Sequence, residues 1–176
     1  MTLRRLDPSD APVYRALMLE AYALHPDAFT SGVEERAALP LSWWERRLNA
    51  DPQAAELVFA AFHEGQLAGV AGLSFERREK VRHKATLFGM YVPIRFRQRG
   101  LGRQLVDAVL AGARERPGVK LVQLTVTQGN ASAQALYESC GFTAFGVEPF
   151  AVAVGEGFVS KVHMWCNMGI PDPSQP

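Results

Sequence analysis

The sequence predicts an α/β fold in which a mixed, mostly antiparallel central sheet carries helices on both faces. Three observations predict it: apolar strand-like runs alternate with helical stretches, a strand–helix–strand unit stands in the middle, and short turns join two pairs of strands. With 176 residues, of which 48% are hydrophobic, the chain can bury one sizeable core. We therefore expect a single domain over residues 1–170 and a flexible tail over residues 171–176.

The N-terminal part is predicted to hold one strand and two helices. Residues 1–6 form a short strand, and residues 11–23 form a helix that starts after a Pro- and Asp-containing turn. Residues 29–39 are predicted to be irregular and acidic. A second helix follows over residues 40–49, with Ser42 as its N-cap.

Two strand pairs are predicted to be antiparallel. Residues 56–63 and 66–75 flank the turn Glu64-Gly65 and read as a hairpin. Near the C-terminus, residues 142–150 and 157–168 form a closing antiparallel pair that follows a helix over residues 130–140.

The middle of the chain predicts a parallel pair. A strand over residues 81–92 is followed by an amphipathic helix over residues 102–114 and a buried strand over residues 119–127. Because a helix connects the two strands, they should lie parallel and be joined by a right-handed crossover. Open α/β sheets bind ligands at the carboxyl ends of such strands.

The segment Arg97-Gln98-Arg99-Gly100-Leu101-Gly102 lies between that strand and that helix and predicts an anion site. The first N–H groups of a helix lack internal partners and lie at the positive end of its dipole. Gly100 and Gly102 carry no side chain that would keep a phosphate from these amides. Since no Ser, Thr, Asp or Asn precedes the helix to cap it, a pyrophosphate can take that place.

Two other phosphate-binding loops are excluded. A P-loop needs Lys and then Ser or Thr after its second glycine, and Arg103-Gln104 follow Gly102 instead. A dinucleotide-binding fingerprint needs a small third residue, and Leu105 occupies that position.

The composition of the chain excludes several classes of binding partner. The net charge of +1 argues against a dedicated nucleic-acid or membrane-surface binder, and no stretch has the apolar length of a membrane span. The start of the chain lacks a secretory apolar region. Cys140 and Cys166 are isolated in sequence and the four histidines are scattered, so no metal site is expected and both thiols read as reduced. These features are typical of a cytoplasmic protein.

Two motifs together resemble the GCN5-related N-acetyltransferase (GNAT) family. The acyl-CoA signature Gln/Arg-x-x-Gly-x-Gly/Ala is matched by Arg97, Gly100 and Gly102. The second signature is an Asn that starts a helix ending in Leu-Tyr-x-x-x-Gly-Phe, and residues 130–142 match it. The resemblance covers residues 58–168; before that only the order of elements agrees.

The resemblance implies acetyl-CoA as cosubstrate and an amine as acceptor. It implies that the strand ending at Met90-Tyr91-Val92 splays from its parallel neighbour, pairs with the pantetheine arm and points one amide at the thioester oxygen. The residues implied for the rest of the cofactor are Arg97, Gln98, Arg99, Gly100, Leu101, Gly102, Arg103 and, for pantetheine, Asn130. The arginines can equally be a solvated basic face, and the side chain of Tyr91 reads better as an ordinary strand residue.

Tyr137 carries the implied catalytic role of general acid to the departing thiolate. A phenol stays protonated at neutral pH and can donate to a thiolate, whose basicity is lower. The alternative is an ordinary core tyrosine on the inner face of its helix.

The acceptor side is less defined by the sequence. Phe29, Glu34, Glu35 and Trp44 are candidates to line it, although an acidic loop is often merely solvated and the aromatic residues can simply pack a helix on the sheet. No general base is assigned, because residues 86–92 contain no carboxylate and His83 is a weak candidate. His163 and Cys166, on the last strand, read as core or edge residues.

The function expected is acetyl transfer from acetyl-CoA to an amine by direct attack in a ternary complex, in a monomer or homodimer. The alternatives are another acyl-CoA donor or a hydroxyl acceptor on the same scaffold, and a CoA-binding sensor without turnover. No cysteine stands where it would support an acyl-enzyme.

Overall fold

A computed structural model describes residues 1–171 as one seven-stranded mixed sheet with helices on both faces. The strands follow the spatial order β1-β2-β3-β4-β5-β7-β6, in which only β4 and β5 are parallel. The strands are β1 (Thr2–Arg5), β2 (Glu56–His63), β3 (Gln66–Phe75), β4 (Lys84–Tyr91), β5 (Leu121–Thr127), β6 (Thr143–Val154) and β7 (Gly157–Asn167). The helices are α1 (Ala11–Leu24), α2 (Val33–Ala37), α3 (Leu41–Arg47), α4 (Leu101–Glu115) and α5 (Ala131–Ser139).

The predicted α/β class and the parallel central pair are therefore confirmed. The hairpin β2–β3 has the predicted bounds, and the crossover through α4 joins β4 to β5 as expected. The described part of the chain contains no helix that is long and apolar enough to cross a membrane. Of the tail predicted over residues 171–176, all but Pro171 lie outside the described residues.

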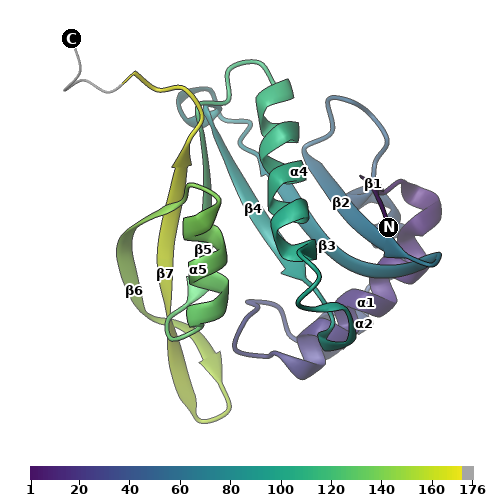
Figure 1. Cartoon of the computed structure of the whole chain (residues 1–176). Coiled ribbons are helices and arrows are strands. Elements are labelled where there is room, and N and C mark those ends of the chain that lie inside the picture. Colours follow the sequence, from purple (N-terminus) through teal and green to yellow (C-terminus); the bar gives the residue numbers. More distant parts are fainter. Residues whose placement is uncertain (172–176) are drawn as a thin grey trace.

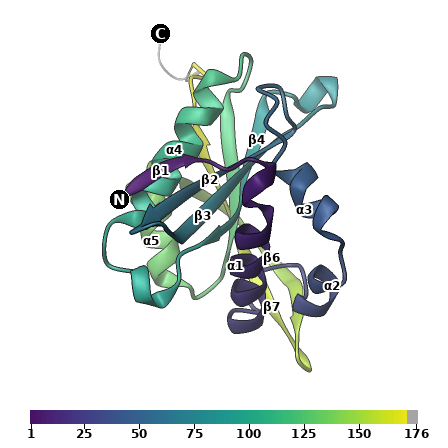
Figure 2. The same cartoon turned by 90° about the vertical axis from the view of Figure 1, so that its right-hand side faces the viewer.

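Helices cover opposite faces of the sheet (Figures 1 and 2), and a hydrophobic cluster lies under each layer of helices. On one face, α4 and α5 cover the sheet with apolar residues such as Leu105 and Val109, both fully buried. On the other face, α1 and α3 pack through Met18 and Trp44 against β2, β3 and β4. The strands β5, β7 and β6 continue the sheet on the other side of β4 from β3.

Local structure differs from the sequence prediction in the second helical region. Residues 29–39 contain the short helix α2, which buries none of its side chains and so leaves no amphipathic pattern to detect. The helix α3 begins at Leu41 after the N-cap Pro40, so Ser42 lies inside the helix and does not cap it. The strand β4 begins at Lys84, because Glu79–Val81 form a turn of 3-10 helix.

The parallel strands β4 and β5 diverge after a short paired stretch, as Figure 1 shows. Their register pairs only Lys84–Thr86 with Leu121–Gln123. Beyond it β4 bulges against β3, where the register shifts between Val70 and Gly72, and Gly89 takes the left-handed φ of 57°. The predicted splay is thus confirmed, and it opens the sheet beside Met90.

Candidate active site

The loop before α4 leaves the start of this helix uncapped. Gly100 is the N-cap residue, with φ 73° and ψ 5°, and no side chain bonds to the first turn. Gln98 also has a positive φ, of 60°. The left-handed conformation turns the chain sharply, so that the free N–H groups of Leu101 and Gly102 begin a helix of fifteen residues. Such a helix start favours a negatively charged group.

Glycine is required at Gly100 and at Gly102 for different structural reasons. A Cβ at Gly100 would find open space, with Gln104 Nε2 3.9 Å away as its nearest atom, so the positive φ is what requires glycine there. A Cβ at Gly102 would lie 2.9 Å from Leu136 Cδ2 and 3.4 Å from Met90 Cε. Gly102 is therefore needed for the close packing of α4 against α5, a reason that the sequence analysis did not give.

A cavity of about 550 Å³ extends from this loop along the end of β4 to α5. We call it the donor cavity. It is lined by His25, Ala28, Phe29, Met90, Tyr91, Val92, Arg97, Gln98, Gly100, Leu101, Gly102, Arg103, Asn130, Ser132, Ala133, Leu136 and Tyr137. Every residue that the sequence assigned to cofactor binding is therefore at this cavity except Arg99.

The three loop arginines point in different directions. Arg97 Nε donates to the carbonyl of Val92 at 2.9 Å, which fixes its side chain at the cavity. Arg103 lies across the gap to α5 and donates to the carbonyl of Ser139 at 3.3 Å. Arg99 turns away, and its NH1 lies 3.0 Å from His63 Nε2. Two of the three arginines thus line the donor cavity.

Tyr137 lies at the inner end of the donor cavity. Its side chain is 8% exposed, and its hydroxyl donates to Met90 Sδ at 3.4 Å across the gap between β4 and α5. Burial raises the pKa of Tyr137 to about 12, so the phenol keeps its proton at neutral pH. Asn130 caps the same helix, its Oδ1 accepting from the N–H of Ala133 at 3.3 Å.

A second cavity, of about 340 Å³, lies between the diverging strands; we call it the acceptor cavity. It shares Ala28, Phe29, Met90, Asn130, Ala133 and Tyr137 with the donor cavity. Its other polar lining residues are Thr30, Thr86, Gln123, Thr125, Thr127, Lys161 and His163. None of its lining residues, all within the described chain, is Asp or Glu. The two cavities therefore meet at Tyr137 and Met90.

Lys161 holds one wall of the acceptor cavity. It is 4% exposed, and its Nζ donates to Thr127 Oγ1 at 2.8 Å and to the carbonyls of Ala28 and Asp27 at 3.0 and 3.2 Å. Thr127 donates in turn to the carbonyl of Asp27 at 2.7 Å. Burial lowers the pKa of Lys161, and three acceptors still satisfy its ammonium. The strands β5 and β7 thus tie down the segment between α1 and α2.

The structure does not bring together all of the residues that the sequence suggested for the acceptor side. Phe29 lines both cavities and packs edge-on against Tyr22 at 5.2 Å between ring centroids. Glu34 lines a separate cavity beside the β6–β7 turn, and Glu35 accepts from the N–H of Gly32 at the start of α2. Trp44 is fully buried against Tyr14, so the expectation that it lines the acceptor side is wrong.

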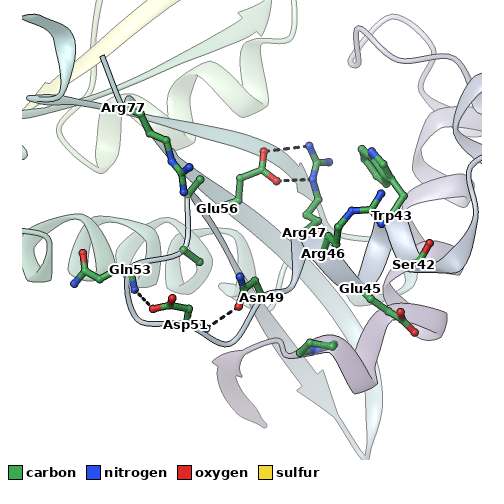
Figure 3. A pocket seen from close by; sticks show the side chains of 13 residues that line it. Ser42, Trp43, Glu45, Arg46, Arg47, Asn49, Asp51, Gln53, Glu56 and Arg77 are labelled. Carbon is green, nitrogen blue, oxygen red and sulfur yellow. Dashed lines mark hydrogen bonds and ion pairs between the residues drawn. The ribbon is translucent and has the colours of Figure 1, made fainter. Parts of the chain in front are cut away.

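A larger cavity, of about 840 Å³, is elsewhere and shares no residue with these two. Figure 3 shows it between α3 and the segment before β2. Arg47 points toward Glu56 and forms a bidentate ion pair at 2.8 and 3.3 Å, while its guanidinium stacks on Trp43. This cavity shares no residue with the loop before α4 or with the splayed end of β4, so it is not the candidate site.

Comparisons with known proteins agree with this geometry. Residues 18–142 match the model of the acetyltransferase (GNAT) family. The chain belongs to the GNAT family of acetyltransferases. It is 36% identical over 110 residues to the [ribosomal protein bS18]-alanine N-acetyltransferase of Salmonella typhimurium, an alignment that covers 59% of this chain and 74% of that protein.

Solved structures extend the similarity to nearly the whole fold. A GNAT acetyltransferase from Streptococcus pneumoniae superposes with a TM-score of 0.83 at 26% identity, covering 96% of this chain and 99% of that one. An acetyltransferase of Salmonella typhimurium solved with acetyl-CoA has the same fold, with a TM-score of 0.78 at 22% identity and 98% coverage of both chains. The family match and the relatives named N-acetyltransferases show that the protein is an acetyl-CoA-dependent N-acetyltransferase.

The structure of this acetyltransferase also adds residues that sequence reasoning missed. His163, expected to be a core or edge residue, lines the acceptor cavity, and so do Lys161, Gln123 and Thr125. The period-2 pattern of β5 could have identified Gln123 and Thr125 as one polar face. The pairing of Thr125 with His163 and of Thr127 with Lys161 became visible only with the β5–β7 register.

Proposed function

We propose that this acetyltransferase moves an acetyl group to a primary amine by direct attack, with both substrates bound together. The observation that carries the proposal is the meeting of donor and acceptor cavities at Tyr137 beside the splayed strands. A ternary complex needs two separate entrances to one reacting centre. The described residues Cys140 and Cys166 line neither cavity, which supports direct attack over an acyl-enzyme.

The residues of the donor cavity suit acetyl-CoA. The uncapped start of α4 and Arg97 and Arg103 would hold the phosphates, and the bulged end of β4 at Met90, Tyr91 and Val92 would pair with the pantetheine arm. Acetyl-CoA supplies an activated thioester carbonyl. A backbone N–H at the bulge would polarise its oxygen, a contribution of about 3–4 kcal/mol in acyl transfer.

Tyr137 acts in this proposal as the general acid. Its hydroxyl is buried between the two cavities and is kept protonated by its raised pKa. It gives a proton to the sulfur as the carbon–sulfur bond breaks, which spares the departure of an unprotonated thiolate.

The acceptor that fits best is a single amine without further positive charge, such as the α-amine of a peptide that begins with a small residue. The acceptor cavity has no carboxylate to hold a polycation, and the buried ammonium of Lys161 repels one. The alanine named in the relative from Salmonella typhimurium is of this class. We place the reaction in the cytoplasm, in one domain over residues 1–170 that acts as a monomer or homodimer and needs no nucleic acid.

A screen for free thiol release from acetyl-CoA tests this function. Peptides with N-terminal Ala or Ser should be acetylated, and spermidine and aminoglycosides should be poor acceptors. Release with polycations alone would overturn the proposed acceptor class. Thermal stabilisation by CoA without thiol release from any amine or alcohol would favour a sensor, and preference for a longer acyl-CoA or an alcohol would correct the donor or acceptor.

A further inference from the structure

His163, which lines the acceptor cavity, is hydrogen-bonded to Glu148. Glu148 lies on β6 and His163 on β7, and their Oε2 and Nε2 atoms are 2.7 Å apart. The ring of Phe145, also on β6, packs edge-on against the imidazole at 5.8 Å between centroids. Two contacts from the neighbouring strand therefore fix the orientation of the His163 ring.

The hydrogen bond to Glu148 also selects the tautomer of the neutral His163 ring. A carboxylate only accepts hydrogen bonds, so Nε2 must carry the proton toward Glu148. The lone pair of the neutral ring is then on Nδ1, which has no hydrogen-bond partner among the described residues. An imidazole oriented in this way by a carboxylate is prepared to accept a proton.

His163 is the one titratable side chain of the acceptor cavity that is free to take up a proton. Lys161 and Tyr137 are the others among the described lining residues. Lys161 uses all three of its donors as an ammonium, and Tyr137 holds its own proton. Thr125, directly opposite His163 on β5, does not titrate.

We propose that His163, oriented by Glu148, is the proton acceptor for the amine, directly or through one water molecule. This proposal rests on the proposed function, because it needs an amine in the acceptor cavity. His163 is then a catalytic residue and Glu148 a positioning residue. An amine is an ammonium near neutral pH and attacks only after losing a proton, so the reaction needs such a group.

The protons balance across the two cavities. His163 takes one proton from the ammonium and passes it to solvent through the exposed third of its side chain. The amine nitrogen then bonds to the acetyl carbon, and the carbon–sulfur bond breaks. Tyr137 gives its proton to the sulfur and regains one from the nitrogen through water. The net products are the amide, free CoA and one proton released to solvent.

Two histidine variants test the role of His163. For His163→Gln, kcat/KM for the amine should fall by about 10²-fold or more, the lower end of general-base contributions. The thermal stabilisation by CoA should be unchanged, because His163 does not line the donor cavity. His83→Gln is the matched control, since His83 lines neither cavity, and it should keep wild-type turnover.

Chemical rescue separates catalysis from structure. Free imidazole should restore turnover to His163→Ala in a concentration-dependent way and should do nothing for Tyr137→Phe. For Glu148→Gln, ¹⁵N NMR of the ring should show that the preference for the Nε2–H tautomer is lost, with a smaller fall in kcat than for His163→Gln. A ring tautomer that Glu148→Gln leaves unchanged would remove Glu148 from the proposal.

The outcomes distinguish the two proposals. Wild-type turnover in a folded His163→Gln variant overturns His163 as the proton acceptor and leaves the proposed acetyl transfer standing. Loss of turnover that imidazole cannot rescue in folded His163→Ala assigns the residue a structural role and also overturns the inference. A wild-type protein that releases no thiol with any amine would instead overturn the proposed function.

Discussion

At the scale of single residues, the side chain of Tyr137 is buried where the two cavities meet. The hydroxyl contacts only the weak acceptor Met90 Sδ among the described residues, and burial raises the pKa of the phenol to about 12. A proton donor in acetyl transfer must keep its proton until a thiolate forms, and a desolvated phenol does so at neutral pH. In the proposed mechanism, the helix start at Gly100 would hold the phosphates of acetyl-CoA.

Tyr137→Phe should remove the proton donor and little else. The ring keeps its packing against Phe142 and only the contact with Met90 Sδ is lost. We expect kcat to fall by about 10²–10⁴-fold with little change in KM for acetyl-CoA, measured under conditions where chemistry limits turnover. A folded variant within about threefold of wild-type kcat, far below that range, would return Tyr137 to the role of a core residue.

Gly100→Val should abolish cofactor binding. The residue has φ 73°, which a β-branched side chain rarely adopts, and its side chain would enter the space before the free amides of α4. The matched control is Gly118→Val, because Gly118 has φ 87° and open space around it but lies in a turn away from both cavities. Both variants should lose similar stability, and only Gly100→Val should lose the thermal shift with CoA. Equal CoA shifts in the two variants would show that the loop is merely a turn.

At the scale of elements, the site depends on the divergence of β4 from β5 and on the hydrogen bonds that hold the segment between α1 and α2. The bulge at Gly89 turns β4 away from β5, and the close packing of α4 on α5 at Gly102 brings Tyr137 to the opening. On the other side, Lys161 binds the segment between α1 and α2 to the end of β5. These bonds fix the segment that contributes Ala28, Phe29 and Thr30 to the lining of the acceptor cavity.

Lys161→Met should loosen that segment. The variant keeps most of the side-chain length but leaves Thr127 Oγ1 and the carbonyl of Ala28 without their buried donor, a cost of about 1–3 kcal/mol in unfolding free energy. We expect KM for the amine to rise more than KM for acetyl-CoA, and urea unfolding with steady-state kinetics will measure both effects. Unchanged stability together with unchanged amine KM would contradict this role.

At the scale of the whole molecule, one sheet carries two hydrophobic clusters, one on each face. The candidate active site lies where the strands β4 and β5 diverge. The first cluster holds β4, β5, α4 and α5 together, and the second holds α1 and α3 on the opposite face. Ligands that bridge the splay should therefore stabilise the entire fold, since unfolding of either layer destroys the site.

Acetyl-CoA and CoA should raise the melting temperature in proportion to the logarithm of their concentration above Kd. This follows because they bind the folded state alone. At equal concentration NAD and ATP should give much smaller shifts, since neither offers a pantetheine arm to the bulged end of β4. Equal shifts from all of these ligands in differential scanning fluorimetry would indicate a general nucleotide site.

The acetyltransferase should lose stability at alkaline pH through its tyrosines. Burial raises the pKa of all four tyrosines above the ordinary value of 10. The rise is large at Tyr14 and Tyr137, which are 1% and 8% exposed. The unfolded chain ionises near pH 10 while the folded chain keeps its phenol protons, so the stability present below pH 10 is lost as the pH rises toward 12. Tyrosinate absorbance should therefore appear together with unfolding, and tyrosinate formation well before unfolding would contradict this.

The sequence by itself predicted most of the elements and the residues of the proposed donor site. Apolar period and turn chemistry act over neighbouring residues, so the hairpin β2–β3, the helix α4 and the Asn130 cap could be predicted. The glycine loop could also be assigned, because an uncapped helix start is a local property of residues 97–102. The short helix α2 escaped because it buries no side chain.

Only the tertiary structure decided the acceptor half. The register of β5 with β7 places Thr125 opposite His163, and that of β6 with β7 brings Glu148 to the same imidazole. These pairings join residues from different parts of the chain, and a shift of one residue would turn every side chain to the other face. The place of Trp44 also depends on tertiary contacts. The sequence allows its aromatic side chain to line a cavity or to fill a core, and the packing of α3 on Tyr14 places it in the core.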